Sequence, residues 1–548
     1  MQKSKINLKD KKLIFAAWNA ANKNDNPFQN WYLPLKDTLG EVILFDTARN
    51  YFRFGKEKLK ENLLNLIKQN KPDYLLVIMI YDELDPIFFQ ELKIISPQTI
   101  ILSLFSDDDW RYEDYSRYYC LGIDYPIVNI TDLDTDRGYR KDGIKNYSLS
   151  LGMNCKLFKP SSQNKVYTVS FVGRPNSSRI EYIKFLLEQG IAVKIWGDGW
   201  ENYPEISKAY QGRASAEDLV NITNESKINL SFTQGGYGKL QMKGRIFEAA
   251  ACNAFTLIEH FDAYKKYYID QKEIIMFKDK EDLLKKIKFY LHHDKKRNEI
   301  AKEAYKKTIK KYNKHKELLS YFKNISLVEN ELRNKIIFNP QVSVSIINKE
   351  DFNNEKIISE KTLNSKFVAF SNKKDSHQYK HFLQIYSLEK TSKKVSCCDA
   401  YISDIGLPHY LLFKAKQGSV QANLETFQKC LHISQLLVEK EYFLKNIEKF
   451  KKYFLGDPIA IPNEEMAFVS IPLVTINIVP RINSEEYAKI FQMKFLDRLY
   501  SLFYQKKIFF HPYPYFLAYK ALRDKNLRTE LMKNILDKKK LFKIKKGI

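Results

Sequence analysis

Short, unbroken apolar runs alternate with polar and helical segments over the first part of the chain. They lie at 13–18, 42–46, 74–79, 99–105 and 127–131. Between the second and third runs, residues 56–70 repeat leucine and isoleucine at helical spacing. Uninterrupted apolar strands that alternate with helices are typical of a parallel sheet covered on both faces. The pattern therefore predicts a Rossmann-like α/β domain at 1–160.

The same alternation resumes after a polar link at 140–165. Apolar runs predict further strands at 167–172, 228–232, 255–258 and 274–277. Helical patterns lie at 218–226, 281–292 and, with many lysines, 295–325. A second Rossmann-like domain is thus predicted at 165–328. The remaining residues, 335–548, are predicted to form a C-terminal α/β accessory domain, with strands at 342–347 and 466–474.

The unit at 228–261 reads as a strand, a glycine-bearing loop, a helix and a second strand. Glycines such as Gly235 and Gly236 let a backbone approach a phosphate closely. A helix that starts after such a loop offers free N–H groups and the positive end of its dipole to a diphosphate. This combination is typical of nucleotide-binding folds.

The first turns of the helix in this unit hold Lys243, Arg245 and Glu248. An arginine can grip phosphate with two parallel hydrogen bonds, and a carboxylate can accept hydrogen bonds from a ribose diol. Asn253 suits a left-handed helix end, because asparagine tolerates positive φ. An alternative is that the three charged residues form the solvated face of an amphipathic helix.

Two further glycine loops precede this unit. The strand at 167–172 ends in Gly173 and Arg174, which form a second phosphate-facing loop, and Ser177 or Ser178 would cap the next helix. The following strand ends in a loop that contains Gly197 and could line the base pocket. Each loop alone is a weak signal, and their order before 228–261 makes the set more specific.

Three consecutive carboxylates, Asp107, Asp108 and Asp109, follow the fourth apolar run. Ligands of open parallel sheets bind beyond the carboxyl ends of the strands. A sugar acceptor needs a base close by, so these residues are candidate catalytic groups, with Asp25 and Asp82 behind them. The alternative is that the aspartates cap a helix or form a solvated turn.

The run KGRIFEAAACNAFTLIEHF, with the helical segment after it, resembles the donor-binding domain of GT-B glycosyltransferases. The resemblance is strongest to the CgeB-like (spore maturation protein-like) group and covers about 70–325. In that group a glycine stands where this chain has Asn253. Many related enzymes also carry a second glutamate eight positions before Glu248, and this chain has Leu240 there.

The resemblance implies a GT-B fold with two Rossmann-like domains facing a cleft. It implies a metal-independent glycosyltransferase, with no cofactor, that moves a sugar from a nucleotide-diphosphate donor to a glycan or protein acceptor, as in polysaccharide biosynthesis. In this interpretation Gly173, Arg174, Gly197, Gly235, Gly236, Lys243, Arg245 and Glu248 bind the donor, and Asp107, Asp108, Asp109 and Glu248 are the catalytic candidates.

The stretch 365–402 faintly resembles the middle of a family-2, GT-A-type glycosyltransferase. The metal-binding acidic cluster of that family would fall on 371–375, where Asp375 is acidic but Lys373 and Lys374 stand where carboxylates belong. Lysines repel a cation, so the resemblance implies a degenerate, inactive GT-A-like domain. An unrelated α/β accessory domain is the alternative.

Charge and composition complete the prediction. The net charge of +25 is typical of proteins that meet polyanions, although the lysine excess is spread along the chain as a compositional habit would be. No apolar run is long enough to span a membrane, and the six cysteines show no C-x-x-C pair. We expect a cytoplasmic protein with peripheral contact to anionic membrane and no nucleic-acid partner. The competing hypothesis is an inactive transferase scaffold that binds polyanions or a membrane surface.

Overall fold

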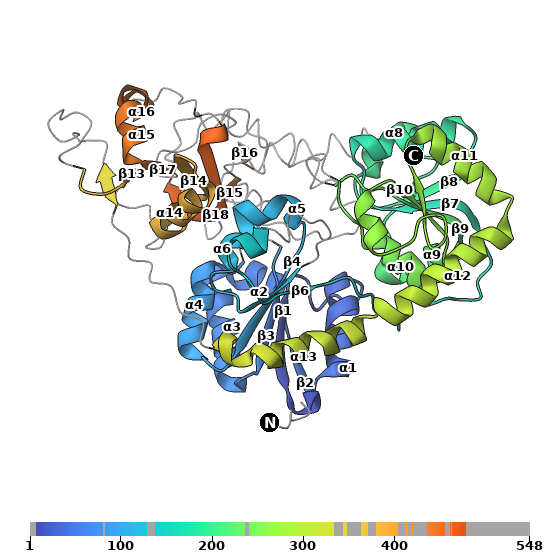
Figure 1. Cartoon of the computed structure of the whole chain (residues 1–548), viewed down its shortest axis with the longest axis horizontal. Helices are drawn as coiled ribbons and strands as arrows, with labels where there is room; N and C mark the ends of the chain where they lie inside the picture. The colour runs from blue at the N-terminus through green and yellow to red at the C-terminus, as the bar shows by residue number, and fades with distance from the viewer. Residues whose placement is uncertain are drawn as a thin grey trace, which may run out of the picture. The chain divides into compact units, whose positions relative to one another are not determined.

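Three β-sheets organise the part of the chain that the structure describes (Figure 1). The computed structural model describes residues 7–80, 83–128, 138–235 and 240–333, and then 344–347, 363–370, 380–403, 411–414, 419–420, 436–454, 461 and 463–477. The chain divides into two units. The first comprises Met1–Tyr51 and Lys58–Ile337, and the second comprises Phe52–Glu57 and Phe338–Ile548.

The first sheet has six parallel strands in the order β2-β1-β3-β4-β5-β6. Their bounds are β1 Lys12–Ala17, β2 Glu41–Asp46, β3 Tyr74–Ile78, β4 Ile100–Phe105, β5 Tyr125–Val128 and β6 Ser148–Leu149. The central strands are buried along nearly their whole length, as strands are when helices cover both faces. Each of the first five predicted apolar runs therefore forms a strand of this sheet.

Helices and short helical turns connect these strands. The helices are α1 Leu33–Thr38, α2 Thr47–Phe54, α3 Lys56–Asn70, α4 Pro86–Ile95, α5 Asp108–Arg111 and α6 Arg117–Tyr119. The predicted helix at 56–70 is α3, which buries Leu59, Leu63 and Ile67 along one face. Asp85 caps α4 by accepting a hydrogen bond from the backbone N–H of Phe88 at 3.0 Å.

The second sheet has five parallel strands in the order β11-β10-β9-β7-β8. They are β7 Tyr167–Val172, β8 Val193–Trp196, β9 Ser226–Ser231, β10 Thr256–Glu259 and β11 Ile275–Phe277. The helices between and after them are α8 Ser177–Glu188, α9 Ala216–Glu225, α10 Arg245–Ala251, α11 Lys280–Leu291 and α12 Asp294–Lys311. A parallel sheet brings all its strand ends to one edge, and the loops of the predicted donor site leave from that edge.

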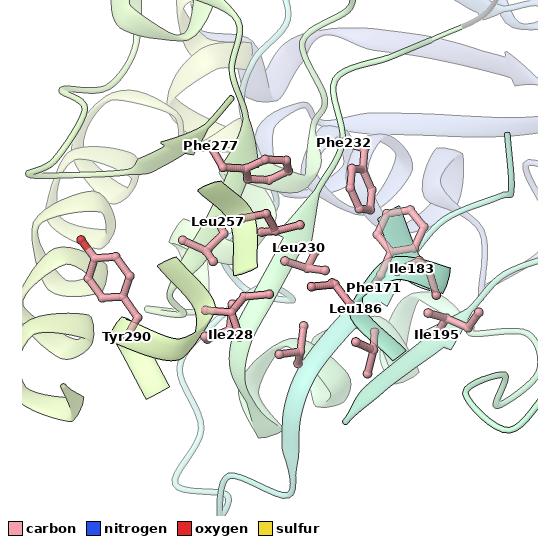
Figure 2. Packing of buried hydrophobic residues seen from close by; sticks show 14 of the residues in the cluster. Phe171, Ile183, Leu186, Ile195, Ile228, Leu230, Phe232, Leu257, Phe277 and Tyr290 are labelled. Carbon is pink, nitrogen blue, oxygen red and sulfur yellow. The ribbon is translucent and has the colours of Figure 1, made fainter. Parts of the chain in front are cut away.

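Apolar side chains from several strands of this sheet pack into one core (Figure 2). Phe171 from β7 contacts Phe232, which follows β9, with ring centroids 5.0 Å apart. Phe232 in turn meets Phe277 of β11 at 6.1 Å. These buried aromatic rings lie next to the carboxyl ends of their strands and hold the loops that follow in fixed positions.

The basic segment predicted as helical at 295–325 is helical, and it is divided between two helices. α12 ends at Lys311, and α13 runs over Lys314–Arg333 (Figure 1). At the break, Asn313 forms a parallel bridge with Met153 in the link between the two sheets. The break lets α13 turn back to the first sheet, where its apolar side chains join the core around Tyr74 and Trp31.

The second unit contains a mixed sheet in the order β12-β13-β17-β14-β15-β16, with β18 paired in parallel to β14. Its elements are β12 Ser345–Ile347, β13 Phe367–Phe370, α14 Lys380–Thr391, β14 Val395–Ser403, β15 Leu411–Lys414, β16 Ser419–Val420, β17 Leu436–Glu439, α15 Lys440–Lys445, α16 Ile447–Phe454 and β18 Met466–Asn477. The strands predicted at 342–347 and 466–474 correspond to β12 and β18. The proposed acidic cluster at 371–375 lies outside the described residues, so the GT-A-like assignment stays a prediction.

The α/β class and the two parallel, Rossmann-like sheets predicted for a GT-B fold are confirmed. None of the helices in the described ranges combines the length and apolarity needed to cross a membrane. Cys120, Cys155, Cys252, Cys397 and Cys398 are all free thiols, as expected from their spacing.

Candidate functional site

The two predicted glycine loops after β7 and β8 touch each other backbone to backbone. A Cβ atom built on Gly197, whose φ is 138°, would lie 2.3 Å from the carbonyl oxygen of Gly173. That same carbonyl accepts a 2.7 Å hydrogen bond from the indole N–H of Trp200. A side chain at position 197 would push these loops apart, so glycine there allows the close approach.

Arg245 and Glu248 form an ion pair at the start of α10, over the end of β7. The guanidinium Nη1 donates to Glu248 Oε2 at 2.6 Å, and Nη2 donates to the carbonyl of Val172 at 3.3 Å. The two side chains are 23% and 11% exposed, so the pair is largely shielded from water. Arg245 and Glu248 therefore lie together next to Val172, the residue before Gly173, and their roles in donor binding stay predictions.

α10 begins two residues later than predicted. Its N-cap is Gly244, and Lys243 lies in the loop before the helix, where its backbone N–H donates to the hydroxyl of Tyr264 at 3.2 Å. The predicted helix end is confirmed, because Asn253 has φ 54° directly after the helix. The cap of α8 was misassigned: it is Asn176, whose side chain accepts from the N–H of Arg179.

A second guanidinium, which the sequence interpretation missed, joins the loops of this site. Arg179 donates from Nη1 to the carbonyl of Arg174 at 2.7 Å and from Nη2 to the carbonyl of Gln234 at 3.3 Å. Burial lowers the pKa of Arg179, the negative charge of Glu259 raises it, and the positive charge of Arg245 lowers it. Two guanidinium groups that disfavour each other's charge form a place where a bound anion is stabilised.

A hairpin-like loop brings Gly235 and Lys243 together. Gln234 and Leu240 form an antiparallel bridge, and Lys243 Nζ donates to the side-chain oxygen of Gln241. A Cβ on Gly235 would lie 2.8 Å from that oxygen and 3.2 Å from Lys243 Nζ. Gly235 thus leaves room for the side chains of Gln241 and Lys243, and its predicted close approach to a phosphate stays a prediction. Gly236 lies outside the described residues.

Glu259 at the end of β10 fixes the start of this loop, and no sequence pattern indicated this role. Its carboxylate Oε2 accepts from the backbone N–H groups of Thr233 at 2.7 Å and Gln234 at 3.3 Å. The hydroxyl of Thr233 donates back to the carbonyl oxygen of Glu259 at 2.6 Å. These bonds tie β9 to β10 at the strand edge from which the predicted donor loops leave.

The three consecutive aspartates after β4 do not act as one cluster. Asp107, which has a left-handed backbone at φ 60°, accepts a hydrogen bond from the side-chain amide of Gln241. Asp108 is 4% exposed and accepts from Ser116 and Tyr139 within the first sheet's own loops. For Asp109 the structure describes the backbone, as part of α5, and Asp82 lies outside the described residues.

Another acidic candidate, Asp25, sits in the loop after β1. Burial raises the pKa of its carboxyl, while hydrogen bonds from Asn22 and the charge of Arg213 act in the opposite direction. The backbone N–H of Ala216 donates to the carbonyl of Asn24 at 3.3 Å, so this loop contacts the loop before α9. Asp25 and Asp107 are therefore two carboxylates of the first sheet's loops that lie near loops of the second sheet.

Taken together, the strand ends of the second sheet present Arg179, Lys243 and Arg245, with Glu248 beside them. Such a set suits a polyvalent anion next to a hydroxyl-bearing group. Within the described ranges, His, Cys, Asp and Glu side chains nowhere gather into a group of three that could hold a metal ion.

Comparison with known proteins places a known family on this part of the chain. Residues 179–319 match the model of a family described as glycosyl transferase-like. This segment is a glycosyltransferase-like domain. It contains Arg179, Lys243, Arg245 and Glu248, the charged residues that the geometry brings together.

Solved glycosyltransferase structures resemble the chain at low identity. HepE from Anabaena, in complex with UDP and glucose, is 11% identical over 59% of this chain and 100% of that one, with a TM-score of 0.42. Sucrose-phosphate synthase from Thermosynechococcus elongatus is 11% identical over 59% of this chain and 100% of that one, with a TM-score of 0.43. The DNA-modifying β-glucosyltransferase is 12% identical over 57% of this chain and 99% of that one, with a TM-score of 0.39. No curated protein sequence matches the chain. The predicted glycosyltransferase class is confirmed for residues 179–319 by the family match, and the CgeB-like subgroup stays a prediction.

The burial of Asp108 predicts a stability that depends on pH. Burial raises the pKa of this carboxyl to about 6 in the folded protein, although Ser116 and Tyr139 donate hydrogen bonds to it. An unfolded aspartate titrates near pH ~3.9, so the folded state binds the proton more tightly. The contribution of Asp108 is fully present below about pH 4 and is lost as the pH rises through about 6, a change of about 3 kcal/mol.

Asp108→Asn should therefore flatten the fall in unfolding free energy between pH 4 and pH 8, measured by urea unfolding at several pH values. Asp37→Asn is the control with the opposite sign, since hydrogen bonds from Lys156 and His315 lower the pKa of Asp37. If the unfolding free energy of Asp108→Asn falls with pH as steeply as that of the unmodified protein, Asp108 titrates normally.

Proposed function

We propose that the protein is a glycosyltransferase whose donor, a nucleoside diphosphate sugar, binds at the carboxyl edge of the second sheet. The observation that carries the proposal is the shielded Arg245–Glu248 pair, anchored to the end of β7, with Arg179 beside it. Arg245 is bonded to the carbonyl of Val172, the residue before Gly173, and Lys243 precedes Arg245 by two residues.

The donor diphosphate would lie against Arg179, Arg245 and Lys243, with the backbone N–H groups near Gly173 and Gly235 completing the cradle. Arg174 and Gly197 complete the proposed donor-binding set. Glu248 would accept hydrogen bonds from the ribose, since its carboxylate already faces Arg245 on one side. Fixed positive charge in a shielded site binds a diphosphate more strongly than the same charge in bulk water.

In the transfer step the bond between the sugar and the diphosphate breaks, the acceptor hydroxyl oxygen forms the new bond to the sugar, and the hydroxyl proton passes to a base. Negative charge then develops on the leaving diphosphate. Arg179, Lys243 and Arg245 are positioned to stabilise that charge without moving, which is the largest catalytic effect that such a site can supply. The proposal assigns this role to side chains and needs no bound metal ion.

The acceptor is proposed to be a glycan or a protein that reaches the donor from the first sheet's loops. Membership of the CgeB-like group, a role in polysaccharide biosynthesis, a cytoplasmic location and peripheral contact with anionic membrane belong to the same proposal. The lysine-rich surface of α12 supports the membrane contact, because each basic residue near an anionic surface contributes about 1 kcal/mol.

A thermal-shift screen against UDP, GDP, ADP, CMP and TDP tests the donor site. We expect one nucleoside diphosphate to raise the melting temperature, and we expect Glu248→Ala to abolish that increase, because the ribose loses its acceptor and Arg245 loses its orientation. At a hundredfold excess of ligand over its Kd the stabilisation is about 2.7 kcal/mol.

Glu273→Ala is the matched control. Glu273 is also 11% exposed and also makes a 2.6 Å ion pair, with Lys307, but it lies away from the loops of the donor site. The control should retain the nucleotide response. If no nucleotide stabilises the protein, or if both variants respond equally, the donor site is refuted. Salt-dependent binding to anionic polymers or vesicles would then favour the inactive scaffold.

A further inference from the structure

The side chain of Gln241 connects the two Rossmann-like parts of the first unit. Its amide Nε2 donates to Asp107 Oδ1 at 2.5 Å, and its Oε1 accepts from Lys243 Nζ. Asp107 belongs to the loop after β4 of the first sheet, whereas Gln241 and Lys243 belong to the loop before α10 of the second. A single amide thus joins an anion on one side to a cation on the other.

We propose that this Asp107–Gln241–Lys243 relay sets the position of Lys243 for the donor, so that Asp107 tunes donor affinity from the other domain without touching the donor. The inference rests on the proposed function, because it takes Lys243 as a ligand of the diphosphate. Asp107 is then a positioning residue, and the sequence interpretation of it as a catalytic carboxylate is the competing hypothesis.

The chemistry of an amide makes the relay directional. A carboxylate accepts hydrogen bonds only, and an ammonium group donates only. An amide can satisfy both at once if its N–H₂ end faces the carboxylate and its carbonyl faces the lysine. Asp107 therefore fixes which end of Gln241 points to Lys243, and this orientation holds Nζ in one place.

The backbone on both sides restrains the relay. Gln241 donates its backbone N–H to the carbonyl of Thr233 at 2.9 Å, next to the Gln234–Leu240 bridge. Asp107 has a left-handed backbone, and its carbonyl accepts from the N–H of Arg111 at 3.0 Å at the start of α5. Two short segments with bonded backbones therefore hold the amide of Gln241 between them.

Gly235 is part of the same arrangement. Any side chain at this position would start 2.8 Å from Gln241 Oε1 and 3.2 Å from Lys243 Nζ, which is too close for the present geometry. A glycine at this position therefore lets the Gln241–Lys243 bond lie directly against the backbone. In the proposal, a phosphate oxygen approaches Nζ beside this backbone.

A double-mutant cycle on nucleotide affinity tests the relay. By charge alone, Asp107→Asn should tighten binding of an anionic nucleotide, because it removes a negative charge. We expect the opposite: the Kd of the stabilising nucleoside diphosphate, measured by calorimetry, should rise about fivefold to tenfold, since Lys243 loses its orientation. Gln241→Ala should have a similar effect, and the double variant should be no worse than either single variant.

Each alternative gives a different result. If Asp107 is only a catalytic base, Asp107→Asn lowers turnover and leaves the Kd unchanged, which overturns the relay. If Asp107 touches the donor directly, its effect persists in the Gln241→Ala background, which also overturns it. Glu113→Gln, at an exposed carboxylate near Asp107, controls for charge and should not weaken binding.

Failure of the proposed function is distinguishable from failure of the relay. If the unmodified protein binds no nucleoside diphosphate, the donor site itself is wrong. If the unmodified protein binds a nucleoside diphosphate and Arg245→Lys weakens that binding, the proposed donor site is supported. An unchanged Kd in both Asp107→Asn and Gln241→Ala then removes the relay alone.

Discussion

Arg245→Ala is expected to lower kcat/KM for the nucleotide-sugar donor by about 10²–10³-fold, which corresponds to about 3–4 kcal/mol of transition-state stabilisation. The guanidinium reaches the end of β7 through Val172 and is held by Glu248, so its direction is fixed before any ligand binds. Negative charge that develops on the leaving diphosphate would meet the Arg245 guanidinium, which does not need to reorient. The measurement is steady-state release of the nucleoside diphosphate at several donor concentrations.

Arg245→Lys separates charge from geometry. A lysine keeps the positive charge and can still pair with Glu248, but it lacks the two parallel donors of a guanidinium. We expect this variant to fold normally and to lose about tenfold in kcat/KM. Alanine leaves the shielded Glu248 carboxylate without its partner, so part of its larger effect is a local loss of stability, and circular dichroism of both variants measures that part.

Lys286→Ala is the control for removal of a cation. Lys286 is 22% exposed, pairs with Asp282 at 2.6 Å and donates to the carbonyl of Met276, so its surroundings closely match those of Arg245. It packs against β11, an edge strand of the sheet, and no proposed donor ligand contacts it. Equal losses in Lys286→Ala and Arg245→Ala would show that the effect is structural and would contradict the assignment of Arg245.

Much of the fold could be predicted from the sequence, because hydrophobic periodicity is a local property. The apolar runs at 13–18 and 74–79 became buried central strands, and the helix at 56–70 was placed within its observed bounds. Asn253 ended α10 with a left-handed backbone because that preference also belongs to a single residue. In the same way, Arg245 and Glu248 could be paired from their spacing of three residues along a helix.

The contacts that complete the candidate site are long-range, and no local pattern carries them. Arg179 looks like an ordinary helix residue until its guanidinium meets the loop at Gln234. Gln241 meets Asp107 across 134 positions of sequence. The acidic run at 107–109 suggested one cluster. Asp108 is instead buried and accepts hydrogen bonds from Ser116 and Tyr139, so it does not act together with its neighbours. Which neighbours a side chain meets is decided by packing, so periodicity and spacing could not identify them.

The break between α12 and α13 shows the same limit at the level of an element. Residues 295–325 carry a continuous helical pattern, and no proline or glycine interrupts it. The chain nevertheless leaves the helix at Tyr312 and Asn313, where it pairs with Met153. The reason lies in the next turn, where Lys314 and Glu317 are buried against the first sheet, a contact that outweighs helix continuity.

Glu317→Ala is expected to destabilise the first unit by about 3–5 kcal/mol, the largest stability effect that we predict. Its carboxylate accepts from Lys314 Nζ at 2.7 Å, from Ser150 at 3.3 Å and from the backbone N–H groups of Leu151 and Gly152. Alanine would leave a lysine side chain that is 2% exposed without its counter-charge and would leave two backbone donors without an acceptor.

Lys314→Met tests which partner holds the contact together. The ammonium group lies 4.0 Å from the ring centre of Trp31, and burial lowers the pKa of Lys314, so its charge is itself costly to keep buried. Methionine fills a similar volume, and Glu317 would keep its bonds from Ser150 and the backbone. We therefore expect a loss of only about 1–2 kcal/mol, clearly smaller than that of Glu317→Ala.

An exposed pair on the preceding helix provides the control. Glu303 and Lys306 on α12 are also three residues apart, with their charged atoms 2.6 Å apart, but their side chains are 40% and 57% exposed. Because exposed pairs contribute about 0–1 kcal/mol, Glu303→Ala should leave the urea midpoint nearly unchanged. If Glu317→Ala and Glu303→Ala shift that midpoint equally, burial is not what makes the Glu317 contact strong. A large shift for Glu317→Ala alone would show that the buried carboxylate contributes strongly to the docking of α13, in addition to its apolar contacts, beside the link where Met153 meets Asn313.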